Sequence, residues 1–189
     1  MSIFTEILEK TPQVSDLKKA IAGGEATMVT GLSEIHKTHL IATLINETKK
    51  KKTAIVLTED EMSARRMSQD FNQISEFTGA VFPSRDPVFK PLETVSADYE
   101  QLRMSVLSDL AAGKLSVVFV PVSAALSLLP PPKRVLSSSF KLRTEEEIDQ
   151  SKLIEQLLAG GYIRREQVEG SGQFSSRGGI VDVFPISSS

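Results

Sequence analysis

The residues with the most evident chemical potential lie between Gly31 and Thr38, where the sequence approximates a phosphate-binding loop. Such a loop needs a glycine, four residues, a second glycine, a lysine and then serine or threonine, between a strand and a helix. Gly31, Lys37 and Thr38 fit this spacing, but His36 stands at the second glycine. A side chain there obstructs the approach of backbone amides to phosphate, and the carboxylate of Glu34 would repel it. We therefore predict a degenerate phosphate loop.

A working nucleotide site also needs an acid after a second strand to hold Mg²⁺. The strand-like run 116–120 is followed by Pro121, Val122 and Ser123, without an acid. Acids do follow the strand predicted at 53–58, but we interpret residues 59–61 as the acidic first turn of the next helix, capped by Thr58. We expect no catalytic residue and no cofactor, and ATP binding through Lys37 and Thr38 is the alternative.

The two histidines, His36 and His39, lie close together at one predicted helix start. A zinc site needs at least three protein ligands, and no third ligand is evident nearby. We therefore predict no metal site.

Strands and helices alternate through the first 130 or so residues. Strands are predicted at 26–30, 53–58, 80–82 and 116–120, and helices at about 59–74 and 96–112, with a helix that begins in the degenerate loop. Such alternation is typical of an α/β fold with a parallel sheet and crossover helices. Residues 1–129 are predicted to form this domain, because the prolines at 130–132 mark a boundary.

The remaining residues, 130–189, are predicted to begin a smaller α+β domain. Thr144 with Glu147 resembles a capping box for a helix whose apolar side includes Leu153 and Leu157. Glycines at 160–161 end this helix, residues 169–172 read as a turn between strands, and Ile180–Phe184 is strand-like.

Composition restricts the class of protein further. The chain has 189 residues, a formal net charge of −2 and no cysteine, and 40% of its residues are hydrophobic. These values are ordinary for a soluble globular protein, exclude disulfides and give no global basic field for nucleic acid. No signal peptide and no membrane-spanning run is evident, so we expect a cytoplasmic protein.

Arginines near the C-terminus could bind a partner. On a hairpin-like pairing of the strands, Arg164 or Arg165 and Arg177 could share one exposed face. Arginines held on a rigid sheet suit bidentate binding of carboxylates. By periodicity alone, ordinary solvated side chains are the simpler interpretation.

The ordered set of residues in this region resembles a known family. Gly161-Tyr162, Arg164, Gln167, Gly172-x-Phe174-x-x-Arg177-Gly178-Gly179-Ile180-x-Asp182-x-Phe184-Pro185 is similar to the second domain of bacterial transcription-repair coupling factors (Mfd), a module shared with the excision-repair protein UvrB. The run Glu100–Ser105 with Val117–Val120 is similar to UvrB's RecA-like first domain. Residues 83–95 contain no tyrosine, unlike UvrB's tyrosine-rich hairpin, which favours Mfd.

The resemblance implies a bacterial, cytoplasmic, non-catalytic fragment: a degenerate RecA-like domain at 1–129 and a UvrA-docking domain that begins at 130 and continues past 189. UvrA would bind through Arg164, Arg177 and Phe184, which recruits nucleotide excision repair to a stalled RNA polymerase. The whole protein would be an ATP-dependent translocase on double-stranded DNA. A DNA-binding module is the remaining alternative, with Arg85 and Lys90 as candidate contacts.

Overall fold

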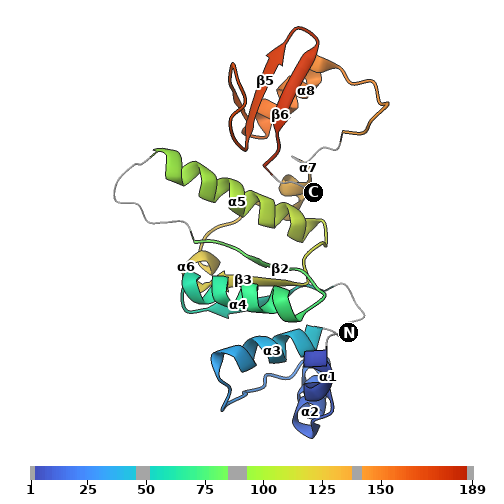
Figure 1. Cartoon of the computed structure of the whole chain (residues 1–189), viewed down its shortest axis with the longest axis vertical. Coiled ribbons are helices and arrows are strands. Elements are labelled where there is room, and N and C mark those ends of the chain that lie inside the picture. Colours follow the sequence, from blue (N-terminus) through green and yellow to red (C-terminus); the bar gives the residue numbers. More distant parts are fainter. Residues whose placement is uncertain (1–2, 46–51, 85–92, 138–141, 187–189) are drawn as a thin grey trace. The chain divides into compact units, whose positions relative to one another are not determined.

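A computed structural model describes residues 3–45, 52–84, 93–137 and 142–186 (Figure 1). These residues group into two compact units. Unit 1 comprises residues 1–84 and 113–126, and unit 2 comprises residues 85–112 and 127–189. Unit 1 therefore ends close to the boundary predicted after residue 129, but the segment 85–112 groups with unit 2; the domain limits themselves stay a prediction.

Unit 1 is built around a parallel sheet. Its elements are α1 (Ile3–Glu9), α2 (Pro12–Ala22), α3 (Glu34–Ile45), β1 (Ala54–Thr58), α4 (Glu61–Ile74), β2 (Gly79–Val81), β3 (Val117–Pro121) and α6 (Val122–Ala125). The strand order is β1-β3-β2, with Ala54 and Gly79 both in register with Val117. The predicted α/β class with a parallel sheet and helices is confirmed.

The core of unit 1 lies between the sheet and two helices. Buried residues from α3, α4 and β3 form one cluster: Ala42, Ile45, Ala64, Met67, Phe71, Val117 and Phe119. Phe71 and Phe119 meet edge to face at 5.9 Å between ring centroids. Gly79 lies against both rings, where a larger residue would not fit. Because α3 and α4 contribute to the same cluster, they cover the same face of the sheet.

The strand predicted at 26–30 is wrong for this structure. Residues 25–30 have no regular secondary structure, every one of them is exposed, and Met28 retains 87% of its accessible surface. A single extended segment gains little without a neighbouring strand to accept its backbone hydrogen bonds. Within the described residues, β1 pairs only with β3, so no partner holds this segment in a strand.

The cap of α4 also differs from the prediction. Asp60, and not Thr58, is the N-cap residue, because its carboxylate accepts a hydrogen bond from the Ser63 backbone N–H at 2.7 Å. The Thr58 hydroxyl donates instead to the Asp60 carbonyl at 2.9 Å. The predicted acidic start of this helix is confirmed.

Unit 2 contains a second, smaller sheet. Its elements are α5 (Glu93–Ala111), α7 (Pro132–Ser137), α8 (Gln150–Ala159), β4 (Ile163–Arg164), β5 (Gln173–Arg177) and β6 (Ile180–Phe184). Strands β5 and β6 form an antiparallel hairpin, whereas β4 pairs with β5 in parallel. The hairpin-like pairing predicted for Arg164 with Arg177 is therefore wrong, since the segment 165–172 returns the chain to the same end of the sheet.

Helix α8 begins later than predicted. Asp149 is its N-cap and accepts hydrogen bonds from the backbone N–H groups of Ser151 and Lys152, at 2.9 and 3.4 Å. The capping box predicted at Thr144 is wrong, because residues 144–145 form a turn in which Glu145 has a φ of 73°. A left-handed residue interrupts a right-handed helix at once.

Candidate functional site

The segment 31–38, which the sequence predicts to be a degenerate phosphate loop, holds its lysine in an ion pair. The ammonium of Lys37 lies 2.5 Å from the Glu34 carboxylate, one helical turn earlier. Hydrogen bonding and charge attraction from Glu34, with a smaller attraction from Glu59, raise the pKa of Lys37 above its ordinary value. The cation that would bind phosphate in a working loop is thus paired with a carboxylate in this structure.

The other residues of this motif are also not arranged to bind phosphate and Mg²⁺. The His36 ring nitrogen Nδ1 lies 2.9 Å from the Ser33 hydroxyl. Thr38 is fully buried, and its hydroxyl has no hydrogen-bond partner among the described residues. A threonine that coordinates Mg²⁺ must present its hydroxyl to the ion. Gly31 has a left-handed φ of 81°, so it serves the turn before α3.

A cavity of about 540 Å³ lies beside this loop, within unit 1. Gly31, Glu34 and Lys37 line it from the loop, and the end of β1 closes it with Leu57, Thr58 and Glu59. Two of its charged groups are carboxylates and one is an ammonium, so the lining carries a formal excess of negative charge. Such a lining disfavours a triphosphate.

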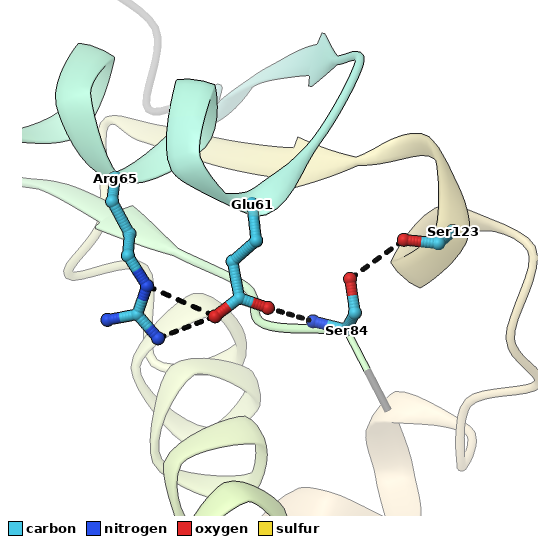
Figure 2. A network of polar contacts seen from close by, with 4 residues as sticks. All are labelled: Glu61, Arg65, Ser84 and Ser123. Carbon is cyan, nitrogen blue, oxygen red and sulfur yellow. Dashed lines mark hydrogen bonds and ion pairs between the residues drawn. The ribbon is translucent and has the colours of Figure 1, made fainter. Parts of the chain in front are cut away.

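Polar contacts at the carboxyl ends of the strands engage the carboxylate of Glu61 (Figure 2). Arg65 donates to Glu61 Oε1 from Nε and Nη2, at 3.1 and 2.5 Å, and the Ser84 backbone N–H donates to Glu61 Oε2 at 3.2 Å. The hydroxyls of Ser84 and Ser123 lie 2.8 Å apart. Glu61 thus links α4 to the segment after β2, and Ser123 lies in α6, the helix that follows β3 directly.

Metal and membrane sites are equally unsupported. Among the described residues, no three histidine or acidic side chains gather as a metal site would require. The helices that the structure describes are also too short or too polar to cross a bilayer. Arg85 and Lys90, the candidate DNA contacts, lie outside the described residues.

The second sheet packs one face against α8. Its other face carries exposed side chains around Ser175, which is buried and donates a hydrogen bond to the Glu166 carbonyl at 2.9 Å. Leu153, Leu157 and Phe174 are buried between the helix and the sheet, with Val181 and Val183 packed against them. Side chains alternate between faces along a strand, so Arg177 on β5 and Phe184 on β6 point away from α8. Both side chains therefore lie on the face of the sheet that is opposite α8.

The outer face combines apolar side chains with one ion pair. Ile163, Ile180 and Phe184 expose 48%, 65% and 48% of their surface. Between them, Arg177 Nη2 lies 3.0 Å from Asp182 Oδ2. We refer to one set of five residues as the outer face: Ile163, Arg177, Ile180, Asp182 and Phe184. An arginine among exposed apolar and aromatic groups is the composition of a binding hot spot.

The predicted partner-binding residues are only partly brought together. Arg164 is in register with the buried Phe174, so its side chain starts on the α8 side of the sheet. From there its guanidinium reaches around to the Ser176 carbonyl, at 3.5 Å. Arg177 and Phe184 share the outer face, and Arg164 borders it from the edge strand.

Sequence reasoning missed Ile163 and Ile180 as members of this face. The sequence could have identified Ile180, because residues 180, 182 and 184 occupy every second position of the strand after the turn at Gly178-Gly179 and so share one face. It could not have identified Ile163, whose face depends on the parallel pairing of β4 with β5.

Comparison with known proteins first relates the C-terminal part of the chain to one protein family. Residues 140–189, which include α8 and the whole second sheet, match the UvrB interaction domain family. This is the part of the chain that carries the outer face.

The full chain is similar to transcription-repair-coupling factors. It is 27% identical over 188 residues to the protein of Bacillus subtilis (strain 168), and 28% identical over 187 residues to that of Staphylococcus aureus (strain MRSA252). These alignments cover 99% and 98% of this chain and 16% of each relative. The resemblance drawn from the sequence, to a transcription-repair coupling factor region with a UvrB-like module, is confirmed. The matches fit a non-catalytic segment.

Proposed function

We propose that this chain is a docking segment that binds UvrA and thereby recruits nucleotide excision repair to a stalled RNA polymerase. The observation that carries the proposal is the outer face itself. It lies within the match to the UvrB interaction domain, and it exposes Arg177 and Phe184 on a sheet that α8 braces from behind. Arg164 extends the same surface from its edge.

The chemistry of the face indicates what the partner presents. Phe184, Ile180 and Ile163 can be covered by apolar side chains, and Arg177 can bind a partner carboxylate in a bidentate pair. In the free chain, Arg177 forms a largely exposed ion pair with Asp182. Replacing this pair by one with a partner carboxylate costs little free energy, because exposed ion pairs are weak. A partner surface with an acid beside an apolar patch therefore fits.

Unit 1 serves, in this proposal, as a non-catalytic domain. Its parallel sheet and its phosphate-loop spacing support descent from a RecA-like nucleotide-binding fold, and His36 at the second glycine position supports the loss of a nucleotide site. Because the chain spans 16% of the length of its relatives, ATP-driven movement on double-stranded DNA and RNA polymerase binding are proposed for the whole protein only, in the bacterial cytoplasm.

The test is calorimetric titration of UvrA into the chain and into single alanine variants at Arg164, Arg177 and Phe184. We expect the Arg177 and Phe184 variants to lose about 2 kcal/mol or more of binding free energy, the scale of a hot spot. Lys19→Ala is the matched control, because Lys19 also forms an exposed ion pair, with Asp16 at 3.3 Å in unit 1. Equal binding by all variants, each folded by circular dichroism, would refute this assignment of the surface.

The two alternative functions make distinct predictions. A nucleotide site would bind Mg²⁺–ATP and lose that binding in Lys37→Ala. A DNA-binding module would bind duplex DNA with an affinity that falls steeply with salt, because phosphate contacts release counterions. Either result would redirect the proposal to unit 1 or to a different partner.

A further inference from the structure

The arginine of the outer face lies next to a turn made of two glycines. Arg177 is the last residue of β5, and it is in register with Ile180, the first residue of β6. Gly178 and Gly179 connect the two strands, and Gly178 has a left-handed φ of 59°. Glycine restricts the backbone least of all residues, so the turn does not by itself order the backbone that carries Arg177. Contacts from other elements therefore decide how well this backbone is ordered.

Helix α8 supplies such contacts from the opposite side of the sheet. The side-chain amide of Gln150 donates to the Gly178 carbonyl at 2.7 Å and to the Ser176 hydroxyl at 3.3 Å. Side chains alternate along β5, which is why Ser176 points toward α8 while Arg177 points to the outer face. Because Ser176 precedes Arg177 and Gly178 follows it, one amide group binds the residues on both sides of the arginine.

Gln150 itself has a well-defined position. It is the first residue of α8 and follows the N-cap Asp149, whose carboxylate accepts hydrogen bonds from two backbone N–H groups of the first turn. The helix packs on the same sheet, since Leu157 and Phe174 are buried in one cluster. The amide group that binds the turn is thus carried by a helix that is fixed to the sheet.

The far end of the Arg177 side chain has a separate contact. Its Nη2 lies 3.0 Å from Asp182 Oδ2. A guanidinium carries five N–H donors in a planar fork, so donors remain for bidentate binding of a further carboxylate. Gln150 at the backbone and Asp182 at the guanidinium together preorganise Arg177. Such preorganisation increases affinity, because ordering a long side chain only on binding costs free energy.

We propose that Gln150 is a positioning residue for the outer face: it orders the Gly178-Gly179 turn and thereby presents Arg177 to a carboxylate on the partner. Gln150 touches no partner in this proposal and acts only through Arg177. The inference rests on the proposed function where it takes UvrA as the partner. The order of the turn is a property of the free chain and can be measured without UvrA.

Backbone dynamics of the free chain test the first step. Gln150→Met removes both hydrogen bonds, and methionine has a helix propensity similar to that of glutamine. Gln156→Met is the matched control, because it makes the same change at an exposed position of the same helix. Nitrogen-15 relaxation should give the Gly178 amide an order parameter of about 0.85 in the unmodified chain and the control, and below about 0.6 in Gln150→Met. An order parameter that Gln150→Met leaves unchanged would overturn the proposal.

Calorimetric titration of UvrA tests the consequence for docking. Gln150→Met should weaken binding about two- to tenfold, the cost of ordering one long side chain, and Gln156→Met should not. The effect should disappear when Arg177 is already alanine and persist when Phe184 is already alanine, because a residue that acts through Arg177 has no effect without it.

Two outcomes separate this inference from the proposed function. A loss of affinity that persists in the Arg177→Ala background would assign Gln150 a general structural role and overturn the inference. Absence of UvrA binding by the unmodified, folded chain would refute the proposed function instead, and the order of the turn would then decide the role of Gln150.

Discussion

Replacing Gly79 by alanine should destabilise unit 1. A Cβ on Gly79 would lie 2.8 Å from Phe71 Cδ1, 2.9 Å from Val117 Cγ1 and 3.2 Å from Phe119 Cε2. Non-bonded carbons prefer about 3.5–4.0 Å. All three neighbours are fully buried, so none can turn into solvent to make room. The backbone would have to move instead.

The magnitude follows from two opposing effects. Overpacking a filled core costs about 1–3 kcal/mol, and the lower chain entropy of alanine in the unfolded state returns about 0.4–1 kcal/mol. We expect a net loss of about 1–2 kcal/mol. Movement of residue 79 would also weaken its two hydrogen bonds with the Asn72 side chain, at 2.8 and 2.9 Å, so the loss should lie toward the upper value.

The assay is urea unfolding followed by far-ultraviolet circular dichroism, with the slope and the midpoint fitted for each variant. Gly23→Ala is the matched control, because Gly23 has a φ of −75° and its added Cβ would meet no atom closer than 3.4 Å. The control should unfold at the same or a slightly higher urea concentration. If Gly79→Ala were as stable as this control, the packing described for the core of unit 1 would be incorrect.

Three further predictions concern single side chains. Leu157→Ala should cost unit 2 about 2–5 kcal/mol, since it opens a cavity in a core with few buried residues, and thermal unfolding measures this loss. The hydrogen bond from the Ser63 backbone N–H lowers the pKa of Asp60. The N-cap formed by Asp60 therefore stabilises the fold fully above the ordinary aspartate pKa, and this stabilisation is lost as the pH falls through the lowered value. Asp60→Asn retains a cap and should remove this acid dependence in unfolding experiments. Glu34→Gln should lower the pKa of Lys37 toward its ordinary value in an NMR titration, and an unchanged value would contradict the ion pair.

Local features of unit 1 were predictable from the sequence. The run at 53–58 and the run at 116–120 are short, apolar and β-branched, and they became β1 and β3 with small shifts at their ends. The histidine at position 36, where the phosphate-loop spacing requires a glycine, is read directly from the sequence, and the degenerate phosphate loop stays a prediction. The segment 26–30 has the same composition as a strand, but composition provides no neighbour, and the prediction there failed.

Cap positions show a similar limit at short range. Thr144 and Thr58 both carry the hydroxyl that suits an N-cap, yet Asp149 and Asp60 cap the helices. Several residues near each helix start could accept the first N–H groups. The residue that does so is decided by where the helix must begin to place Leu153 or Met67 in a core.

The sequence by itself determined the α/β class, the histidine at position 36 and the presence of arginines and Phe184 near the C-terminus, because each depends on residue type and local spacing. Only the tertiary structure decided that β4 runs parallel to β5, that Arg177 and Phe184 share the outer face while Arg164 borders it, and that Asp182 pairs with Arg177. The physical reason is that the face of a strand residue depends on its partner strand and register. The partner strand and the register are fixed by packing against α8, which brings together segments that are distant in the sequence.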